Sequence, residues 1–498
     1  MQPLAPELAQ AEITGIEYDS RRVATGALFF AFPGAKVDGR QFAADAIAHG
    51  AAAVVSESEA PSELVSRWVR VEHGRAALSL AARKFYGSPD ERLMLTGITG
   101  TNGKTTTSYL LDSILRAAGH TTALLGTIEY HLAGRVTKAV NTTPESLDLV
   151  RLFAELEGEG GSQVTMEVSS HALALRRVYG LHFHTAVFTN LTRDHLDFHG
   201  TMEQYFAAKQ LLFEGAGGPP PGFAVVNRDD EWAGKLKFHP RTEVIWYGMG
   251  PESGLRPRHI SSGFQGLRFE VQRGKTRFMV HSPLIGRINV YNILAACGAA
   301  LSYGIEPETI AKGVAALLAV PGRFERVDEG QPFTVVVDYA HTDDALRNVI
   351  SVARALGPKR VITLFGCGGD RDRAKRPLMG QAAAEGSDLV VLTSDNPRSE
   401  DPLAIMNDAL VGIRRTDVPH IVEPDREAAI RKALSAAREG DIVILAGKGH
   451  EPYQVLKDRT IDFDDRKVAR EVLKGYGYRS QSQRDRSQTQ RGHQSEKP

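Results

Sequence analysis

From Leu93 onward, short apolar runs alternate with segments of helical periodicity. The runs LMLTGI, TTALLGTI, QVTMEVSS and TAVFTNL predict strands, with helices expected near residues 105–118 and 144–157. A second series follows the break at VPGRFE, with the runs FTVVVDYA, RVITLFGCGG, DLVVLTSDNP and DIVILAGKGH. Strands that alternate with helices at this spacing are joined by right-handed crossovers and form a parallel sheet covered on both faces. The alternation therefore predicts the α/β fold class.

The length of 498 residues is sufficient for about three domains with separate cores. Before the first series, residues 1–92 mix apolar runs such as ALFFAF with helical stretches and end in the turn-like YGSPDER. We therefore expect three α/β domains and a tail, namely a small N-terminal domain (1–92), a central domain (93–320), a C-terminal domain (321–478) and the tail (479–498).

Three further segments complete the predicted organisation. Residues 264–283, FQGLRFEVQRGKTRFMVHSP, predict antiparallel hairpins inside the central domain, and two helices are expected over about 289–304 and 307–318. After Tyr478 the tail contains no aliphatic or aromatic residue. Such a segment cannot bury enough apolar surface to fold, so we expect it to be disordered.

Charge and cysteine content exclude several classes of protein. Lys plus Arg and Asp plus Glu both number 60, so no overall field favours nucleic acid or an anionic membrane. Only Cys297 and Cys367 occur, which excludes a disulfide framework and fits a reducing compartment. The start of the chain has no secretory signal pattern, and no apolar run approaches the roughly 18 residues of a membrane span. We expect a cytoplasmic protein that binds neither nucleic acid nor membrane.

The stretch GITGTNGKTTT, residues 97–107, follows a predicted strand and opens a predicted helix. Backbone N–H groups in a Gly-rich turn and the positive end of the helix dipole together form an anion site suited to phosphates. Lys104 can reach the terminal phosphates of a nucleotide, and the Thr105 hydroxyl can bind Mg²⁺. The spacing is a variant of the P-loop, and the alternative is a plain Gly-rich turn. We predict a P-loop ATPase-type central domain that binds ATP through Gly100, Thr101, Asn102, Gly103, Lys104, Thr105 and Thr106.

Polar side chains also follow the next predicted strands, where open α/β sheets bind ligands. Glu167 in TMEVSSHAL stands at a strand end and can bind a metal on a nucleotide, although an isolated Glu there is more often an N-terminal helix charge. The stretch TNLTRDHLDFHG places Asp194 and His195 in one turn with further acidic and imidazole groups. Lys209 lies on a predicted amphipathic helix and, from this pattern alone, would be solvated.

The stretch LTSDNPRSEDP places an acid, an amide, a rigid turn and a guanidinium in succession at Asp395, Asn396, Pro397 and Arg398. Pro restricts one backbone dihedral and Asn and Asp favour turns, so the loop should hold a definite shape. Taken alone, it is most simply a solvated turn with an incidental ion pair. The alternative is a binding loop for a ligand that carries both signs of charge.

Together these motifs resemble the Mur ligases, which are ATP-dependent amide-forming enzymes of peptidoglycan precursor synthesis. The resemblance covers about residues 10–470, and the motifs occur in the family's order in GTNGKTT, EVSSH, NLTRDHLD, GRINVYNILAA, PGRFE and DYAHT. The positions that match the family pattern in these motifs are Lys104, Glu167, His195, Asn289, Asn292, Arg323 and Asp338.

Within the family, DSRRV, NTTPES, GCGGDRDRAKRPLMG, DNPR and GKGHE resemble the members that add meso-diaminopimelate to UDP-N-acetylmuramoyl-L-alanyl-D-glutamate. The resemblance implies an N-terminal domain for the UDP end, a central ATPase domain and a C-terminal Rossmann-like domain for the amino acid. It also implies that ATP converts the D-Glu carboxylate into an acyl phosphate, which an amine of diaminopimelate then attacks.

The same resemblance implies roles for single residues. Lys104, Glu167, His195 and Lys209 would be catalytic, and Asn289, Asn292, Arg323 and Asp338 would join the ATP site. The implied Mg²⁺ ligands are Thr105, Glu167, His195 and a carbamylated Lys209. The implied contacts to the UDP-dipeptide are Tyr18, Ser20, Asn141, Thr142, Thr143, Ser169 and Arg177. The implied contacts to diaminopimelate are Arg371, Asp395, Asn396, Pro397, Arg398, Gly447 and Glu451. Leu175 in HALALRR departs from the family, which commonly has Gln there.

Two kinds of alternative remain open from the sequence. One is a related ligase, such as a folylpolyglutamate synthetase or a ligase that adds lysine, although neither is expected to combine DNPR with GGDRD. The other is a non-ligase P-loop ATPase, for which ATP turnover would not depend on an amine and a carboxylate substrate. We expect a monomer whose partners are small molecules: ATP, the UDP-dipeptide and meso-diaminopimelate.

Overall fold

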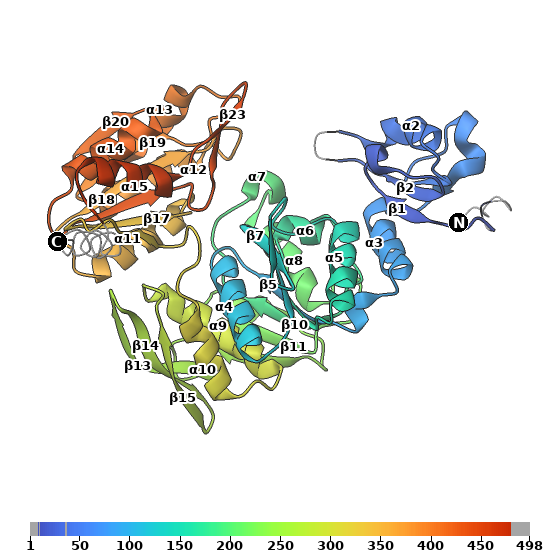
Figure 1. Cartoon of the computed structure of the whole chain (residues 1–498), viewed down its shortest axis with the longest axis horizontal. Helices are drawn as coiled ribbons and strands as arrows, with labels where there is room; N and C mark the ends of the chain where they lie inside the picture. Colours follow the sequence, from blue (N-terminus) through green and yellow to red (C-terminus); the bar gives the residue numbers. More distant parts are fainter. Residues whose placement is uncertain (1–7, 9, 35–36, 480–498) are drawn as a thin grey trace, which may run out of the picture.

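The computed structural model describes residues 8, 10–34 and 37–479 of the chain (Figure 1). Three α/β units follow one another along the longest axis, with the N-terminal unit and the C-terminal unit on either side of the central one. Within the described ranges, no helix is both long enough and apolar enough to cross a bilayer.

The N-terminal unit is a small parallel sheet in the order β1-β2-β3-β4. Its strands are β1 (Gly15–Glu17), β2 (Ala27–Ala31), β3 (Ala53–Ser56) and β4 (Trp68–Arg70), and its helices are α2 (Ala43–Ala48) and α3 (Gly74–Phe85). One face of this sheet packs on α2, and the other contributes Phe30 and Val55 to a core shared with the central unit. The last helix, α3, joins the two units (Figure 1).

The central unit is an eleven-stranded sheet in the order β15-β14-β13-β12-β11-β10-β5-β9-β6-β7-β8. Its middle strands are parallel, whereas β7 and β8 at one end and β14 and β15 at the other are added antiparallel. The strands are β5 (Met94–Thr99), β6 (Thr122–Leu125), β7 (Glu129–Leu132), β8 (Arg135–Lys138), β9 (Gln163–Glu167), β10 (Phe183–Phe188), β11 (Phe223–Asn227), β12 (Glu243–Tyr247), β13 (Leu255–Gly263), β14 (Gly266–Arg273) and β15 (Thr276–Ser282).

Helices cover both faces of this sheet, so its parallel strands are buried and read as apolar runs. On one face pack α4 (Lys104–Ala117), α9 (Ile288–Ser302) and α10 (Pro307–Ala316). On the other face pack α5 (Ser146–Gly158), α6 (Ser170–Ala174) and α8 (Met202–Phe213), with the short α7 (Leu196–His199) beside them.

The C-terminal unit is a six-stranded sheet in the order β16-β17-β21-β18-β19-β20, parallel except for the edge strand β16. Its strands are β16 (Glu325–Val327), β17 (Thr334–Asp338), β18 (Val361–Cys367), β19 (Leu389–Ser394), β20 (His420–Glu423) and β21 (Ile442–Ala446), with a hairpin of β22 (Tyr453–Val455) and β23 (Thr460–Asp462). Its helices, on both faces of the sheet, are α11 (Asp343–Ala355), α12 (Lys375–Gly386), α13 (Pro402–Ile413), α14 (Arg426–Ala436) and α15 (Asp465–Gly475).

The predicted α/β fold class is confirmed, because each unit is an α/β layer structure with a parallel sheet. The predicted central helices correspond to α4, α5, α9 and α10, and the predicted hairpin is β14 and β15, extended by β13. The exact domain boundaries remain predictions. The predicted tail lies outside the described residues except for residue 479.

Candidate functional site

The phosphate loop connects the carboxyl end of β5 to the first turn of α4. Gly100 and Gly103 both have positive φ, and a Cβ on either would collide with Thr189 or Asn292, so the turn requires glycine at both positions. Lys104 begins the helix, and its Nζ donates to the carbonyls of Gly100 at 3.0 Å and Thr101 at 2.9 Å. The lysine therefore lies folded over the loop, at the place where phosphates would be held.

A cavity of about 470 Å³ opens over this loop, between the central and C-terminal units. Its lining contains ten of the residues predicted to bind ATP, namely Thr101, Asn102, Gly103, Lys104, Thr105, Thr106, Asn289, Asn292, Arg323 and Asp338. Gly100 is not part of the lining, but its carbonyl accepts a hydrogen bond from Lys104. Residues more than 230 positions apart in the sequence, such as Thr105 and Asp338, thus lie around one cleft. We call it the nucleotide cleft.

Glu167 ends β9 and lines the nucleotide cleft. Its carboxylate is oriented by Thr127, whose N–H donates to Oε1 at 2.9 Å and whose hydroxyl donates to Oε2 at 3.0 Å. Thr105 is also in the lining, and its Oγ1 accepts from Arg323 Nη2 at 3.2 Å. The cleft therefore presents hydroxyl and carboxylate oxygen, the donor type that Mg²⁺ prefers.

His195 precedes α7 in a left-handed backbone conformation, with φ of 54°. Its imidazole lies 3.3 Å from the carboxylate of Asp194, and its ring is 4.8 Å from that of His171. Desolvation lowers the pKa of His195 below its ordinary value, with Asp194 acting in the opposite direction. A neutral imidazole held in a strained turn is available as a ligand or hydrogen-bond acceptor.

Lys209 is buried, which corrects the sequence pattern that favoured a solvated side chain. Its Nζ donates to Gly100 O at 2.8 Å and lies 4.5 Å from the centre of the Tyr205 ring. Burial lowers the pKa of Lys209 well below its ordinary value, and the nearby Lys104 adds to this shift. The amine lies next to the backbone of the phosphate loop. Within the described residues, no carboxylate forms an ion pair with it.

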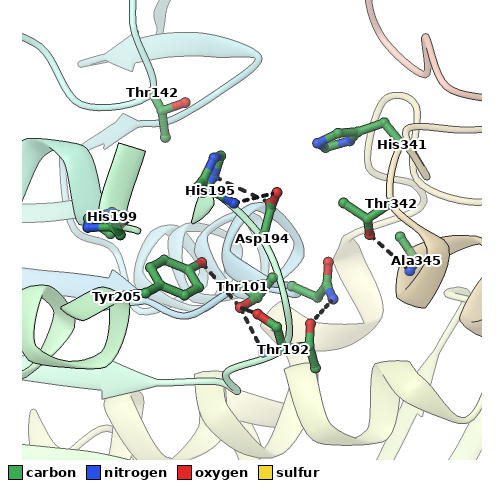
Figure 2. A network of polar contacts seen from close by, with 12 residues as sticks. Thr101, Thr142, Thr192, Asp194, His195, His199, Tyr205, His341, Thr342 and Ala345 are labelled. Carbon is green, nitrogen blue, oxygen red and sulfur yellow. Dashed lines mark hydrogen bonds and ion pairs between the residues drawn. The ribbon is translucent and has the colours of Figure 1, made fainter. Parts of the chain in front are cut away.

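Several polar contacts join the C-terminal unit to the central unit beside the phosphate loop, including those of Thr192 with Asp344 and of Arg193 with Asp372. Asn102 Nδ2 donates to Asp344 Oδ2 at 2.8 Å, and Lys375 Nζ donates to Asp194 Oδ1 at 3.0 Å. Figure 2 shows His341 across the cleft from Asp194 and His195. Hydrogen bonds and ion pairs thus stabilise the arrangement in which the C-terminal unit lies over the nucleotide cleft.

A second cavity, of about 590 Å³, lies at the carboxyl ends of the C-terminal strands and faces the central unit. We call it the amino-acid cavity. Of the residues predicted to bind diaminopimelate, its lining contains Arg371, Asp395, Asn396, Arg398, Gly447 and Glu451. Pro397 lies in the same loop but outside the lining. The two cavities share the lining residues Thr127, Thr142, His195, Tyr339 and His341, so they meet at one point.

The two arginines of the amino-acid cavity differ in environment. Arg398 is half-buried, has φ of 52°, and donates from Nη1 to Gly369 O at 2.8 Å. Arg371 is exposed and donates to the carbonyl of its neighbour Asp370 at 3.0 Å. Because Arg398 is fixed and less hydrated, it offers the better-oriented group for a ligand carboxylate.

The residues predicted to contact the UDP-dipeptide extend from the two cavities to the N-terminal unit. Thr142 lines both cavities, Asn141 lines the amino-acid cavity and Ser169 lines the nucleotide cleft. Arg177 Nη1 donates to Thr143 O at 3.0 Å, which orders that loop.

Toward the N-terminal unit, Tyr18 and Ser20 lie outside both cavities, and the Tyr18 hydroxyl donates to Asp148 of the central unit at 2.5 Å. Leu175 is half-buried at the end of α6.

Several charged residues in the cavity linings, or buried directly behind them, were not predicted as site residues. Asp344, Lys375 and Lys448 belong to the quoted motifs DYAHT, GGDRDRAK and GKGHE or their immediate continuation, yet nothing in the local pattern indicates their partners. Their roles depend on contacts between strand ends that are far apart in the sequence. The one sequence signal for them is that each motif follows the carboxyl end of a predicted strand, where α/β sheets bind ligands.

A buried ion pair braces the strands that carry the amino-acid cavity. Arg426 and Asp465 have fully buried side chains 2.7 Å apart, and Arg426 also donates to Ser394 O at 3.3 Å and Ala446 O at 3.0 Å. These two carbonyls end β19 and β21, directly before the loops that begin with Asp395 and Gly447.

Replacing Arg426 by methionine is expected to destabilise the protein by about 3–5 kcal/mol, because it leaves Asp465 buried without a partner. The control is Arg431→Met on the same helix, since the Arg431–Glu427 pair is exposed on both sides and should contribute less than about 1 kcal/mol. Urea unfolding of the two variants checks this. An equal decrease in the free energy of unfolding in both variants would mean that the buried pair does not stabilise the unit.

Three models of the Mur ligase family match successive stretches of the chain. The model described as "Mur ligase family, catalytic domain" matches residues 12–86, "Mur ligase middle domain" matches residues 98–300, and "Mur ligase, glutamate ligase domain" matches residues 322–449. The matches follow the order of the three α/β units.

The similarity to curated relatives extends over almost the whole chain. A Solibacter usitatus (strain Ellin6076) protein named UDP-N-acetylmuramoyl-L-alanyl-D-glutamate--2,6-diaminopimelate ligase is 77% identical over 477 residues, covering 96% of this chain and 97% of that protein. A Geobacillus kaustophilus (strain HTA426) protein of the same name is 48% identical, covering 94% and 96%. A solved structure of a protein of this name has a TM-score of 0.67 and 33% identity, covering 96% of this chain and 100% of that chain.

Proposed function

The chain belongs to the Mur ligase family, and we propose that it is the ATP-dependent ligase that adds meso-diaminopimelate to UDP-N-acetylmuramoyl-L-alanyl-D-glutamate. This activity is a step of peptidoglycan precursor synthesis. The observation that carries the proposal is the meeting of the nucleotide cleft and the amino-acid cavity at Thr142 and His195. An activated carboxylate at that point would be within reach of both a phosphate donor and an amine.

The reaction has two balanced steps. A carboxylate oxygen of the D-Glu side chain attacks the γ-phosphorus of ATP, and the bond to ADP breaks, leaving an acyl phosphate. An uncharged amine of diaminopimelate then attacks the acyl carbon to form a tetrahedral intermediate, which expels phosphate and loses a proton to give the amide. The protein's task in the first step is positioning and electrostatics rather than covalent chemistry.

In this proposal, backbone N–H groups of the phosphate loop and the Lys104 ammonium hold the β- and γ-phosphates. Burial lowers the pKa of Lys104, while Glu167 acts in the opposite direction, so a bound phosphate would further favour the charged form. Arg323, already 3.2 Å from the Thr105 hydroxyl, is placed to neutralise charge on the transferring group. The remaining predicted contacts to ATP, Asn289, Asn292 and Asp338, lie farther along the same cleft.

The donor set fits Mg²⁺ held jointly by protein and substrate. Within the described part of the chain, no group of three or more His, Cys, Asp or Glu side chains is placed to bind a metal by itself. Mg²⁺ typically binds one or two carboxylates and completes its shell with phosphate oxygens and water. We assign Thr105, Glu167, His195 and carbamylated Lys209 as its holders; when bound, the ion offsets charge on the phosphates and the substrate carboxylate.

We further propose that the N-terminal unit holds the UDP end through Tyr18 and Ser20, and that Asn141, Thr142, Thr143, Ser169 and Arg177 hold the muramoyl-dipeptide. The C-terminal unit would hold diaminopimelate, with its distal carboxylate at Arg371 and Arg398 and its ammonium at Asp395 and Glu451. The protein would act as a monomer in the cytoplasm. The strong similarity to diaminopimelate ligases favours this amino acid over lysine or a folate substrate.

The test of the function is phosphate release with each of the three substrates omitted in turn. Release that requires ATP, the UDP-dipeptide and meso-diaminopimelate together, with formation of the UDP-tripeptide by mass spectrometry, supports the proposal. Equal ATP turnover without the amine and carboxylate substrates would instead indicate a non-ligase ATPase. Hydroxylamine in place of diaminopimelate should trap the acyl phosphate as a hydroxamate.

Lys209→Ala is expected to lower turnover by roughly ten- to a hundredfold, the range typical for loss of a group that supports a metal site. A buried, uncharged amine is the form that reacts with CO₂ to give a carbamate, whose carboxylate can bind metal. Added small carboxylates should therefore restore part of the activity of Lys209→Ala but not of Lys235→Ala, an exposed lysine of the same unit. Full activity without rescue would leave Lys209 as a packing residue.

A further inference from the structure

Lys448 is a buried cation directly behind the amino-acid cavity. It follows Gly447 in the loop after β21, and its side chain is 0% exposed. The neighbouring Gly447 and Glu451 are part of the cavity lining, whereas Lys448 is not. A ligand in the cavity would therefore contact its neighbours rather than Lys448 itself.

The ammonium of Lys448 contacts three cavity residues from behind. Nζ lies 3.1 Å from Asn396 Oδ1, 3.3 Å from Asp395 Oδ1 and 3.5 Å from Glu451 Oε2. Two of the three acceptors are also joined to each other, because Asn396 Nδ2 donates to Glu451 Oε2 at 3.0 Å. Movement of any one of these side chains would break a contact to the buried ammonium.

The charges in this group do not balance. Lys448 offsets one negative charge, but both Asp395 and Glu451 are carboxylates, and the nearby Arg426 is already paired with Asp465. Burial and Asp395 raise the pKa of Glu451, and Lys448 opposes that rise. With Lys448 in place, the group facing the cavity carries a net charge of about −1, which one further ammonium group would neutralise.

We propose that Lys448 is a positioning residue that orients Asp395, Asn396 and Glu451, so that the cavity selects an amino acid through its ammonium group. This inference rests on the proposed function, since the ammonium belongs to the incoming diamino acid. Lys448 touches no substrate and acts only through the three side chains that do.

The test compares Lys448→Met, which keeps the aliphatic stem, with Lys448→Gln, which keeps hydrogen bonding but not charge. Both are expected to raise KM for meso-diaminopimelate about tenfold or more, because contacts to charged groups are lost in the cavity. KM for ATP and for the UDP-dipeptide should stay within about twofold, and so should hydroxamate formation with hydroxylamine, which does not need the cavity. Lys448→Arg, which keeps the charge, should recover part of the loss.

The matched control is Lys432→Met, which removes an exposed ammonium paired with Glu423 in the same unit and should leave every parameter unchanged. Thermal unfolding identifies a variant that fails to fold; if Lys448→Met does so, the folded Lys448→Gln protein decides. A wild-type KM for diaminopimelate in a folded charge-removing variant overturns the proposal, as does an equal fall in hydroxamate formation. If the wild type forms no hydroxamate, the proposed function fails instead.

Discussion

Meso-diaminopimelate is expected to be used in preference to lysine by on the order of 10³-fold in kcat/KM, and Arg398→Ala is expected to remove most of that preference. The two amino acids differ by one carboxylate, so the cavity discriminates between them through the groups that face it. Lysine would leave the half-buried Arg398 without an anion, which adds a desolvation penalty to the lost contact. A guanidinium can also hold a carboxylate through two parallel hydrogen bonds.

Of the two arginines in the cavity, Arg398 is expected to contribute more to this preference than Arg371. Arg371 is exposed, so water can replace a missing carboxylate, and Arg371→Ala should have the smaller effect. Arg373→Ala is the control, because Arg373 belongs to the same loop but pairs with Asp408 outside the cavity. The measurement is kcat/KM for both amino acids on the wild type and the three variants. Comparable wild-type values for the two amino acids, or undiminished selectivity in Arg398→Ala, would show that the DNPR loop does not determine specificity.

Lys104→Ala is expected to lower acyl-phosphate formation by roughly 10²–10³-fold while leaving the fold intact. The side chain contributes a positive charge where negative charge moves during phosphoryl transfer, and its hydrogen bonds are to backbone carbonyls that water can satisfy in the variant. Loss of a half-buried lysine that forms no ion pair within the described residues should not unfold the unit.

Hydroxamate formation at saturating ATP measures this step without diaminopimelate, so binding of the amino acid does not affect the result. Lys312→Ala on α10 serves as the control, since that lysine is exposed on the same unit. Circular dichroism and thermal unfolding of both variants establish that they are folded. Near-normal hydroxamate formation by folded Lys104→Ala would remove the phosphate-loop assignment.

Local features of the sequence were sufficient to predict the fold class and the phosphate loop. Strand and helix periodicities depend on neighbours a few residues apart, and a Gly-rich turn between them is equally local. The helix that begins at Lys104 and the positive φ of Gly100 and Gly103 agree with that reading. The resemblance to a family added roles that residue types alone did not carry, including those of Glu167 and the DNPR loop.

Tertiary structure decided the environment of single charged groups. Lys209 has the sequence surroundings of a surface lysine, yet α8 packs it beneath the carbonyl of Gly100, which is 109 positions away. Asn102 meets Asp344 across 242 positions, and Lys448 meets Asp395 across 53. These distances are set by the right-handed crossovers, which bring the carboxyl ends of parallel strands to one edge, and by the docking of one unit on another. Burial, pairing and the pKa of a group arise from that packing and have no local sequence signature.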